Sequence, residues 1–115
     1  MNIDHTEIFA TLSNETRLRC LYLAARHGEV CVCEVVDTLG IAQPTASKAL
    51  NALKGAGLVR DRRDANWIYY RLNESMPPWI EAIVAATVDQ LTRSKAYLAD
   101  ETAFRKSRVR SVEVC

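Results

Sequence analysis

Two cysteines one residue apart are the side chains best suited to chemistry in this chain. Cys31 and Cys33 stand in the segment "EVCVCEVVDTLG", where a short helix is predicted to begin. Two thiolates form a soft ligand set, which suits soft or borderline metals and thiophilic metalloids. A structural zinc site needs four ligands, and the two histidines, His5 and His27, are isolated from the pair. The spacing therefore favours a thiophile such as trivalent arsenic or antimony over zinc.

The location of the pair at a helix start indicates how binding could act. In a regular helix, residues i and i+2 lie about 200° apart around the axis, so their sulfurs do not easily converge on one atom. A ligand shared by Cys31 and Cys33 is then expected to unwind or bend the first turn. The helix dipole is expected to lower the pKa of both thiols. The simpler alternative is a packing role for small buried residues, which we expect for Cys20 in its apolar-rich helix.

The elements that must position these thiols are mainly helical. Capping residues and hydrophobic periodicity predict helices from Asp4 to Leu12, from Ser13 to Gly28, from Cys31 to Leu39, from Pro44 to Gly55 and from Pro77 to Leu91. After Gly57 the pattern changes to alternation, and "LVRDRR-DAN-WIYYRL" predicts a small β-hairpin. From Arg93 the apolar period weakens. The chain is therefore predicted to divide into a domain over 1–92 and a helix end with a mobile tail over 93–115.

This order of elements predicts a winged helix-turn-helix, because the third and fourth helices are joined only by "GIAQ" and a basic hairpin follows. Small polar side chains at the start of the fourth helix could reach base edges and phosphates. The hairpin tip could contact a neighbouring stretch of DNA backbone or the minor groove. The candidate DNA-binding residues are Gln43, Thr45, Ser47 and Lys48 on the helix, and Arg62, Arg63 and Asn66 at the tip.

The distribution of charge supports double-stranded DNA as a partner. The 115-residue chain has a net charge of only +1, but residues 43–72 carry six basic and two acidic side chains, whereas residues 1–42 carry three basic and six acidic ones. A basic middle on a neutral chain is the local footprint that a phosphate backbone would select. The wide apolar stripe on the helix from Pro77 to Leu91 predicts a partner helix, most simply from a second copy of the chain.

Other function classes find little support in the sequence. The start, "MNIDHTEIFATL", lacks the features of a signal peptide, and no stretch is apolar enough to span a bilayer, so we expect a cytoplasmic protein with reduced thiols and no membrane partner. A thiol enzyme would need a base and an orienting group beside its nucleophile, and neither histidine supplies them. A plain dimerisation module would leave the basic hairpin unexplained. No catalytic residue and no catalytic cofactor are predicted.

The segment from "ETRL" to "WIYYRL" resembles the ArsR/SmtB family of metal-responsive repressors, in particular its arsenic-responsive branch. The resemblance covers about residues 6–92 and is carried by "ETRL", "EVCVCE", "QPTASKALNALKGAGLV" and "WIYYRL". It implies a homodimer that is paired through the first and last helices, represses an arsenic-resistance operon and leaves its operator when arsenite or antimonite binds. By that resemblance, Cys31 and Cys33 are the first two inducer ligands.

The sequence departs from this family in one place. Arsenic-responsive relatives often carry a third cysteine three residues after the second, and Val36 occupies that position here. Either two thiols suffice, which would suit an organoarsenical, or a distant thiol completes the set. Cys115 is the first candidate for that third ligand, and Cys20 is a candidate only if its helix presents it toward Cys31. A thiol-redox regulator on the same DNA-binding scaffold is the alternative function.

Overall fold

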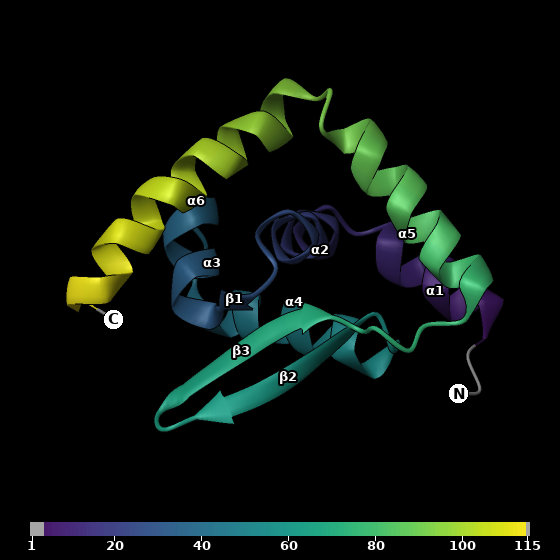
Figure 1. Ribbon diagram of the computed structural model, residues 1–115, viewed down its shortest axis with the longest axis horizontal. Coiled ribbons are helices and arrows are strands. Elements are labelled where there is room, and N and C mark those ends of the chain that lie inside the picture. The colour runs from purple at the N-terminus through teal and green to yellow at the C-terminus, as the bar shows by residue number, and fades with distance from the viewer. Residues whose placement is uncertain (1–3, 115) are drawn as a thin grey trace.

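The computed structural model describes residues 4–114, and it describes side chains up to residue 107. Its elements follow one another in the order α1 (His5–Leu12), α2 (Glu15–His27), β1 (Val30–Cys31), α3 (Val32–Leu39), α4 (Gln43–Gly55), β2 (Val59–Asp64), β3 (Trp67–Leu72), α5 (Pro78–Leu91) and α6 (Lys95–Val114). Figure 1 shows α2 at the centre, the sheet along one side, and α5 and α6 spread as two arms on the other side.

The predicted fold class is confirmed: the chain is a mainly helical winged helix-turn-helix. Helix α4 packs against α2 and α3 through an apolar stripe of four buried side chains: Ala46, Ala49, Leu50 and Leu53. Gly40 ends α3 in the left-handed conformation, with φ 65°, so that the chain can turn within three residues into α4. This turn fixes α4 on the scaffold.

The sheet has three strands, one more than the predicted hairpin. Strand order is β1-β3-β2, and all pairings are antiparallel. The hairpin turns at Ala65 and Asn66 with Ala65 at φ 54°, and β3 also pairs with the two residues of β1. The register of that added strand is Val30 opposite Tyr70 and Cys31 opposite Tyr69. The hairpin is therefore hydrogen-bonded to the cysteine segment itself.

Three predicted helix starts, those of α2, α3 and α4, were off by one residue, and α4 begins at Gln43 instead of Pro44. Asp4 caps α1 as predicted, with its carboxylate accepting from the Thr6 amide at 2.8 Å. Helix α2, however, is capped by Asn14 and not by Ser13, because the Asn14 side chain accepts from the Arg17 amide at 3.0 Å. Helix α3 begins at Val32, and Cys31 is its extended N-cap. The second difference matters for the thiol geometry.

Helix α5 agrees with its prediction, and α6 was not foreseen. Where the sequence indicated a helix end and a tail after residue 92, the structure has α6, which packs on α3 and α2. Two of its buried residues are charged. Asp100 accepts two hydrogen bonds from Arg19, at 2.7 and 2.9 Å, and Glu101 accepts from Arg26 and from the Tyr22 hydroxyl, each at 2.9 Å. Because both carboxylates are buried, these pairs hold α6 specifically across α2.

Within the described part of the chain, no helix combines the length and the apolar character needed to cross a membrane.

Candidate thiol and nucleic-acid site

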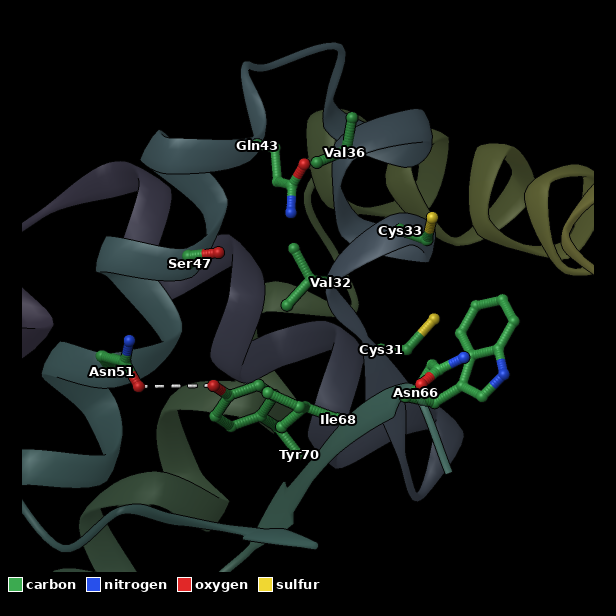
Figure 2. A pocket seen from close by; sticks show the side chains of 11 residues that line it. Cys31, Val32, Cys33, Val36, Gln43, Ser47, Asn51, Asn66, Ile68 and Tyr70 are labelled. Atoms are coloured by element: carbon green, nitrogen blue, oxygen red, sulfur yellow. Dashed lines mark hydrogen bonds between the residues drawn. The ribbon is translucent and has the colours of Figure 1, made fainter. Parts of the chain in front are cut away.

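The two cysteines lie on either side of a strand-to-helix junction. Cys31 has extended backbone angles, φ −102° and ψ 163°, whereas Cys33 lies in the first turn of α3. Figure 2 shows both sulfur atoms on the side of the segment away from the Val32 side chain. The prediction that the sulfurs are held 200° apart on one helix is therefore wrong, because Cys31 is outside the helix. The expected unwinding of the first turn, which assumed both cysteines on one helical turn, therefore does not follow.

The environment of Cys31 opposes ionisation. Burial raises the pKa of its thiol to about 11, and the nearby Glu34 carboxylate adds to this effect, although backbone N–H groups of Glu34 and Cys33 act in the other direction. The expected lowering of this pKa by the helix dipole is therefore wrong, because desolvation outweighs it. The Glu34 carboxylate accepts a hydrogen bond from the Cys31 amide at 3.0 Å and so completes a capping box that fixes the junction.

Cys20 behaves as the sequence predicted. It is fully buried in the core on α2, and burial raises the pKa of its thiol to about 12. Cys115, the first candidate for a third ligand, lies outside the described residues. Among the residues that are described, no group of three histidine, cysteine or acidic side chains is placed to hold a metal ion.

A pocket of about 580 Å³ joins the thiol segment to the predicted DNA-binding elements (Figure 2). Side chains from three places line it: the cysteine segment, the exposed edge of α4 and the hairpin. Its lining residues are Cys31, Val32, Cys33, Val36, Gln43, Ser47, Asn51, Asn66, Trp67, Ile68 and Tyr70. The structure thus brings the candidate inducer ligands and part of the candidate DNA-binding set into one concave surface.

The four predicted residues of α4 divide between this pocket and the outer surface. Gln43 and Ser47 line the pocket, whereas Thr45 and Lys48 are exposed outside its lining. Asn51 was missed, although it follows Gln43 and Ser47 at the helical spacing of four residues. Its side-chain oxygen accepts from the Tyr70 hydroxyl at 3.3 Å, which ties α4 to the hairpin.

The predicted hairpin residues differ in their surroundings. Arg62 donates two hydrogen bonds to the Glu29 carboxylate, at 2.7 and 2.8 Å, and its guanidinium lies 4.5 Å from the centre of the Tyr69 ring. Arg63 is exposed and makes no ion pair with any residue described here. Asn66 lines the pocket at the hairpin turn. Glu29 was not singled out from the sequence, because its partner is distant along the chain.

Comparison with known proteins decides the family. The model for the arsR family of bacterial regulatory proteins matches residues 14–61. The arsenic resistance transcriptional regulator ArsR2 of Pseudomonas putida is 40% identical over 101 residues, which cover 88% of this chain and 85% of that protein. The chain belongs to the ArsR family.

Two further relatives support this assignment to the ArsR family. The regulator ArsR1 of Pseudomonas putida is 43% identical over 82 residues, covering 71% of this chain and 64% of that protein. The homodimeric winged helix-turn-helix domain Mb0332 of Mycobacterium bovis has a TM-score of 0.63 and 30% identity, over 78% of this chain and 80% of that domain. The ArsR-family chain is thus a DNA-binding transcriptional regulator and not an enzyme, in agreement with the sequence.

Within this ArsR-family chain, the cysteine junction contacts both elements that would meet DNA. Strand β1 pairs with β3 of the hairpin, and α3 packs against α4. A ligand that bridges Cys31 and Cys33 would bond to the two sides of the β1–α3 junction at once. The arrangement can therefore transmit a change at the sulfurs to the hairpin and to α4 through direct neighbours.

Proposed function

We propose that the protein is a homodimeric repressor of an arsenic-resistance operon, and that trivalent arsenic or antimony releases it from operator DNA by binding Cys31 and Cys33. The observation that supports the proposal is a pocket whose lining includes both cysteines together with Gln43 and Ser47 of α4. The names of the two Pseudomonas relatives as arsenic resistance regulators support the inducer class. Cys115 stays the candidate for a third ligand.

The proposed DNA interface consists of the start of α4 and the hairpin tip. Gln43, Thr45 and Ser47 would meet base edges, with Lys48 and Arg63 on phosphates and Asn66 at the adjoining groove. Arg62 would contribute to this interface to the extent that its pair with Glu29 leaves it available.

The proposed dimer pairs through α1 and α5. The His5 and Trp79 rings stack with their centres 4.5 Å apart, which places the two helices side by side. Phe9 on α1 is 56% exposed, a large apolar surface for a single copy of the chain to leave in water. The homodimeric state of the Mycobacterium relative supports this pairing.

In this scheme, inducer binding acts on the junction and not by unwinding α3. Bridging the two sulfurs changes the angle between β1 and α3, and the hairpin then shifts relative to α4. A coupling free energy of about 1–3 kcal/mol would weaken operator binding by roughly 5- to 150-fold.

The test measures how tightly the reduced protein binds DNA from upstream of its own gene. Fluorescence anisotropy of the labelled DNA reports the binding. We expect tight binding that arsenite abolishes, and loss of that response in Cys31→Ser and in Cys33→Ser. Cys20→Ala is the matched control, because it removes a buried thiol outside the pocket, and it should respond as the parent does. Normal release from both serine variants would refute the sensing site. Release by peroxide with no response to arsenite would favour the thiol-redox alternative.

A further inference from the structure

We propose that Asn51 of α4 reads a guanine in the major groove, and that the Tyr70 hydroxyl sets this preference by holding the Asn51 amide in one orientation. This assignment rests on the proposed function, because it takes α4 as the helix that meets base edges. It goes further by giving one side chain one base. Asn51 is the residue that contacts DNA in this scheme, and Tyr70 is a positioning residue.

Asn51 lies on the edge of α4 that faces the concave surface between this helix and the hairpin. It follows Gln43 and Ser47 at the helical spacing of four residues, and all three side chains line the pocket. The Asn51 side chain is also exposed. A duplex that lays its base edges along Gln43 and Ser47 would therefore bring a further base edge to Asn51.

Tyr70 is fixed in place by the sheet. It lies on the middle strand, β3, opposite Val30 of β1 and Asp61 of β2, and it is buried. Burial raises the pKa of its hydroxyl above the ordinary value, so the hydroxyl stays protonated at neutral pH. A buried hydroxyl needs an acceptor for its proton, and the Asn51 side-chain oxygen accepts that hydrogen bond at 3.3 Å.

This hydrogen bond decides which way the Asn51 amide faces. An asparagine amide has an oxygen that accepts hydrogen bonds and a nitrogen that donates two. Figure 2 shows the Asn51 oxygen turned toward the Tyr70 hydroxyl and the nitrogen turned away from it. The group that Asn51 offers to DNA is thus a donor, whereas its acceptor is engaged within the protein.

A donor without a neighbouring acceptor selects a different base from the one that asparagine usually contacts. Asparagine contacts adenine through both amide atoms, because adenine presents an acceptor, N7, beside a donor, the N6 amino group. Guanine presents two acceptors in the major groove, N7 and O6, and so suits the two N–H groups of Asn51. Thymine presents one acceptor beside its methyl group, and cytosine presents a donor. Guanine is therefore the base that this arrangement favours.

The test selects duplexes from a randomised DNA pool with the reduced full-length protein and sequences those that bind. We expect a guanine position whose selection depends on Asn51. Asn51→Ala should lose discrimination at that position alone, by about 2- to 13-fold, the effect of one hydrogen bond. Asn51→Asp keeps an oxygen for the Tyr70 hydroxyl but can only accept from DNA, so it should select cytosine at that position.

Tyr70→Phe tests the positioning role. Without the hydroxyl the Asn51 amide is free to turn, so the selected base should shift from guanine toward adenine. A loss of packing alone would weaken binding to every sequence and would leave this preference where it was. Tyr69→Phe is the matched control, because it removes the hydroxyl of the neighbouring tyrosine on the opposite face of β3, and its selection should equal that of the parent protein.

Three results would overturn the assignment. They are an unaltered selection by Asn51→Ala, a base other than guanine at the Asn51-dependent position of the parent protein, and guanine retained by Tyr70→Phe.

Gln43→Ala, taken through the same selection, separates this failure from that of the proposed function. If Gln43→Ala changes the selected bases and Asn51→Ala does not, the assignment to Asn51 fails and the proposed DNA interface stands. If neither variant changes them, or if the parent protein enriches no sequence, the proposed interface at α4 fails as well.

Discussion

Helix α4 and the sheet β1-β3-β2 carry the candidate DNA-binding residues, and their polar side chains are used in different ways. On α4, Lys48 is exposed with no ion pair to any residue in the described part of the chain. In the sheet, most charges are already committed: Arg62 to Glu29, Arg71 to Glu74 and Lys54 of α4 to Asp61 of β2. The start of α4 is thus open to an outside partner, whereas most charged side chains of the sheet are paired within the chain.

This difference points to separate roles. An uncommitted polar face can exchange water for base edges at little structural cost. The sheet, in contrast, is connected to the thiol site. Its strand β1 contains Cys31, and its Arg62 is ion-paired with Glu29, which lies two residues before Cys31. We infer that α4 supplies most of the sequence recognition and that the sheet connects the thiols to DNA binding.

The largest expected effect is the pH dependence of the reactivity of Cys31, in strand β1 of the sheet. Because burial raises the pKa of Cys31 to about 11, its thiolate fraction should grow by about tenfold for each pH unit between 7 and 10. Alkylation of Cys31 by iodoacetamide in the reduced protein, followed by peptide mass spectrometry, should accelerate in the same proportion.

Glu34→Gln is the matched variant for this measurement, since it keeps a side-chain oxygen for the capping contact and removes the charge that opposes ionisation. It should raise the alkylation rate of Cys31 at pH 7. A rate that levels off near pH 8 in the parent protein would show that the junction favours thiolate after all.

The next effect tests recognition by α4. A glutamine that makes a paired contact with a base contributes about 1–3 kcal/mol, so Gln43→Ala should weaken operator binding by about 5- to 150-fold. Lys54→Ala, at the far end of α4 and ion-paired with Asp61, is the control and should change affinity little. Equal losses in the two variants, measured by anisotropy, would contradict a specific role for the start of α4.

The ease with which α4 was predicted also separates it from the sheet. Its buried stripe repeats at the helical period, so local sequence is enough to find both its core face and its polar face. Strand β1 has only two residues and is defined by its pairing with β3, so no local sequence pattern predicts it. The same limit hid the Arg62–Glu29 pair, whose partners are 33 positions apart.

Helix α6 was missed for a related reason. The residues that hold it include the buried Asp100 and Glu101. From sequence alone, acidic residues are expected to be exposed to solvent. These two are buried because Arg19 and Arg26 on α2, more than 70 residues away in sequence, neutralise them. The thiol pKa was misjudged because a helix dipole can be inferred from sequence, whereas the burial that outweighs it cannot.

A smaller effect separates the two neighbouring arginines of the hairpin. If Arg63 contacts a phosphate, Arg63→Ala should reduce the slope of log affinity against log salt by about 1. Arg62→Ala should reduce the slope less, because its charge is already shared with Glu29. Titrations at several salt concentrations measure both slopes, and a larger change for Arg62 would show that DNA takes this arginine from Glu29.

The smallest effect comes from Glu29 itself. Glu29→Gln removes one negative charge beside the hairpin and releases Arg62, so operator affinity at low salt should rise slightly and the salt slope should steepen by up to about 1. The lost pair is partly exposed, and such pairs contribute about 0–1 kcal/mol, so the fold should survive. Glu74→Gln, which removes the partner of Arg71 at the other end of β3, is the control for a general charge effect.

If the sheet links the thiols to DNA binding, Glu29→Gln should also need more arsenite for release than Glu74→Gln does, because freeing Arg62 for DNA biases the hairpin toward the bound arrangement. Identical arsenite responses in the two variants would leave Glu29 as a local partner of Arg62 only and would shift the link to the contact between α3 and α4.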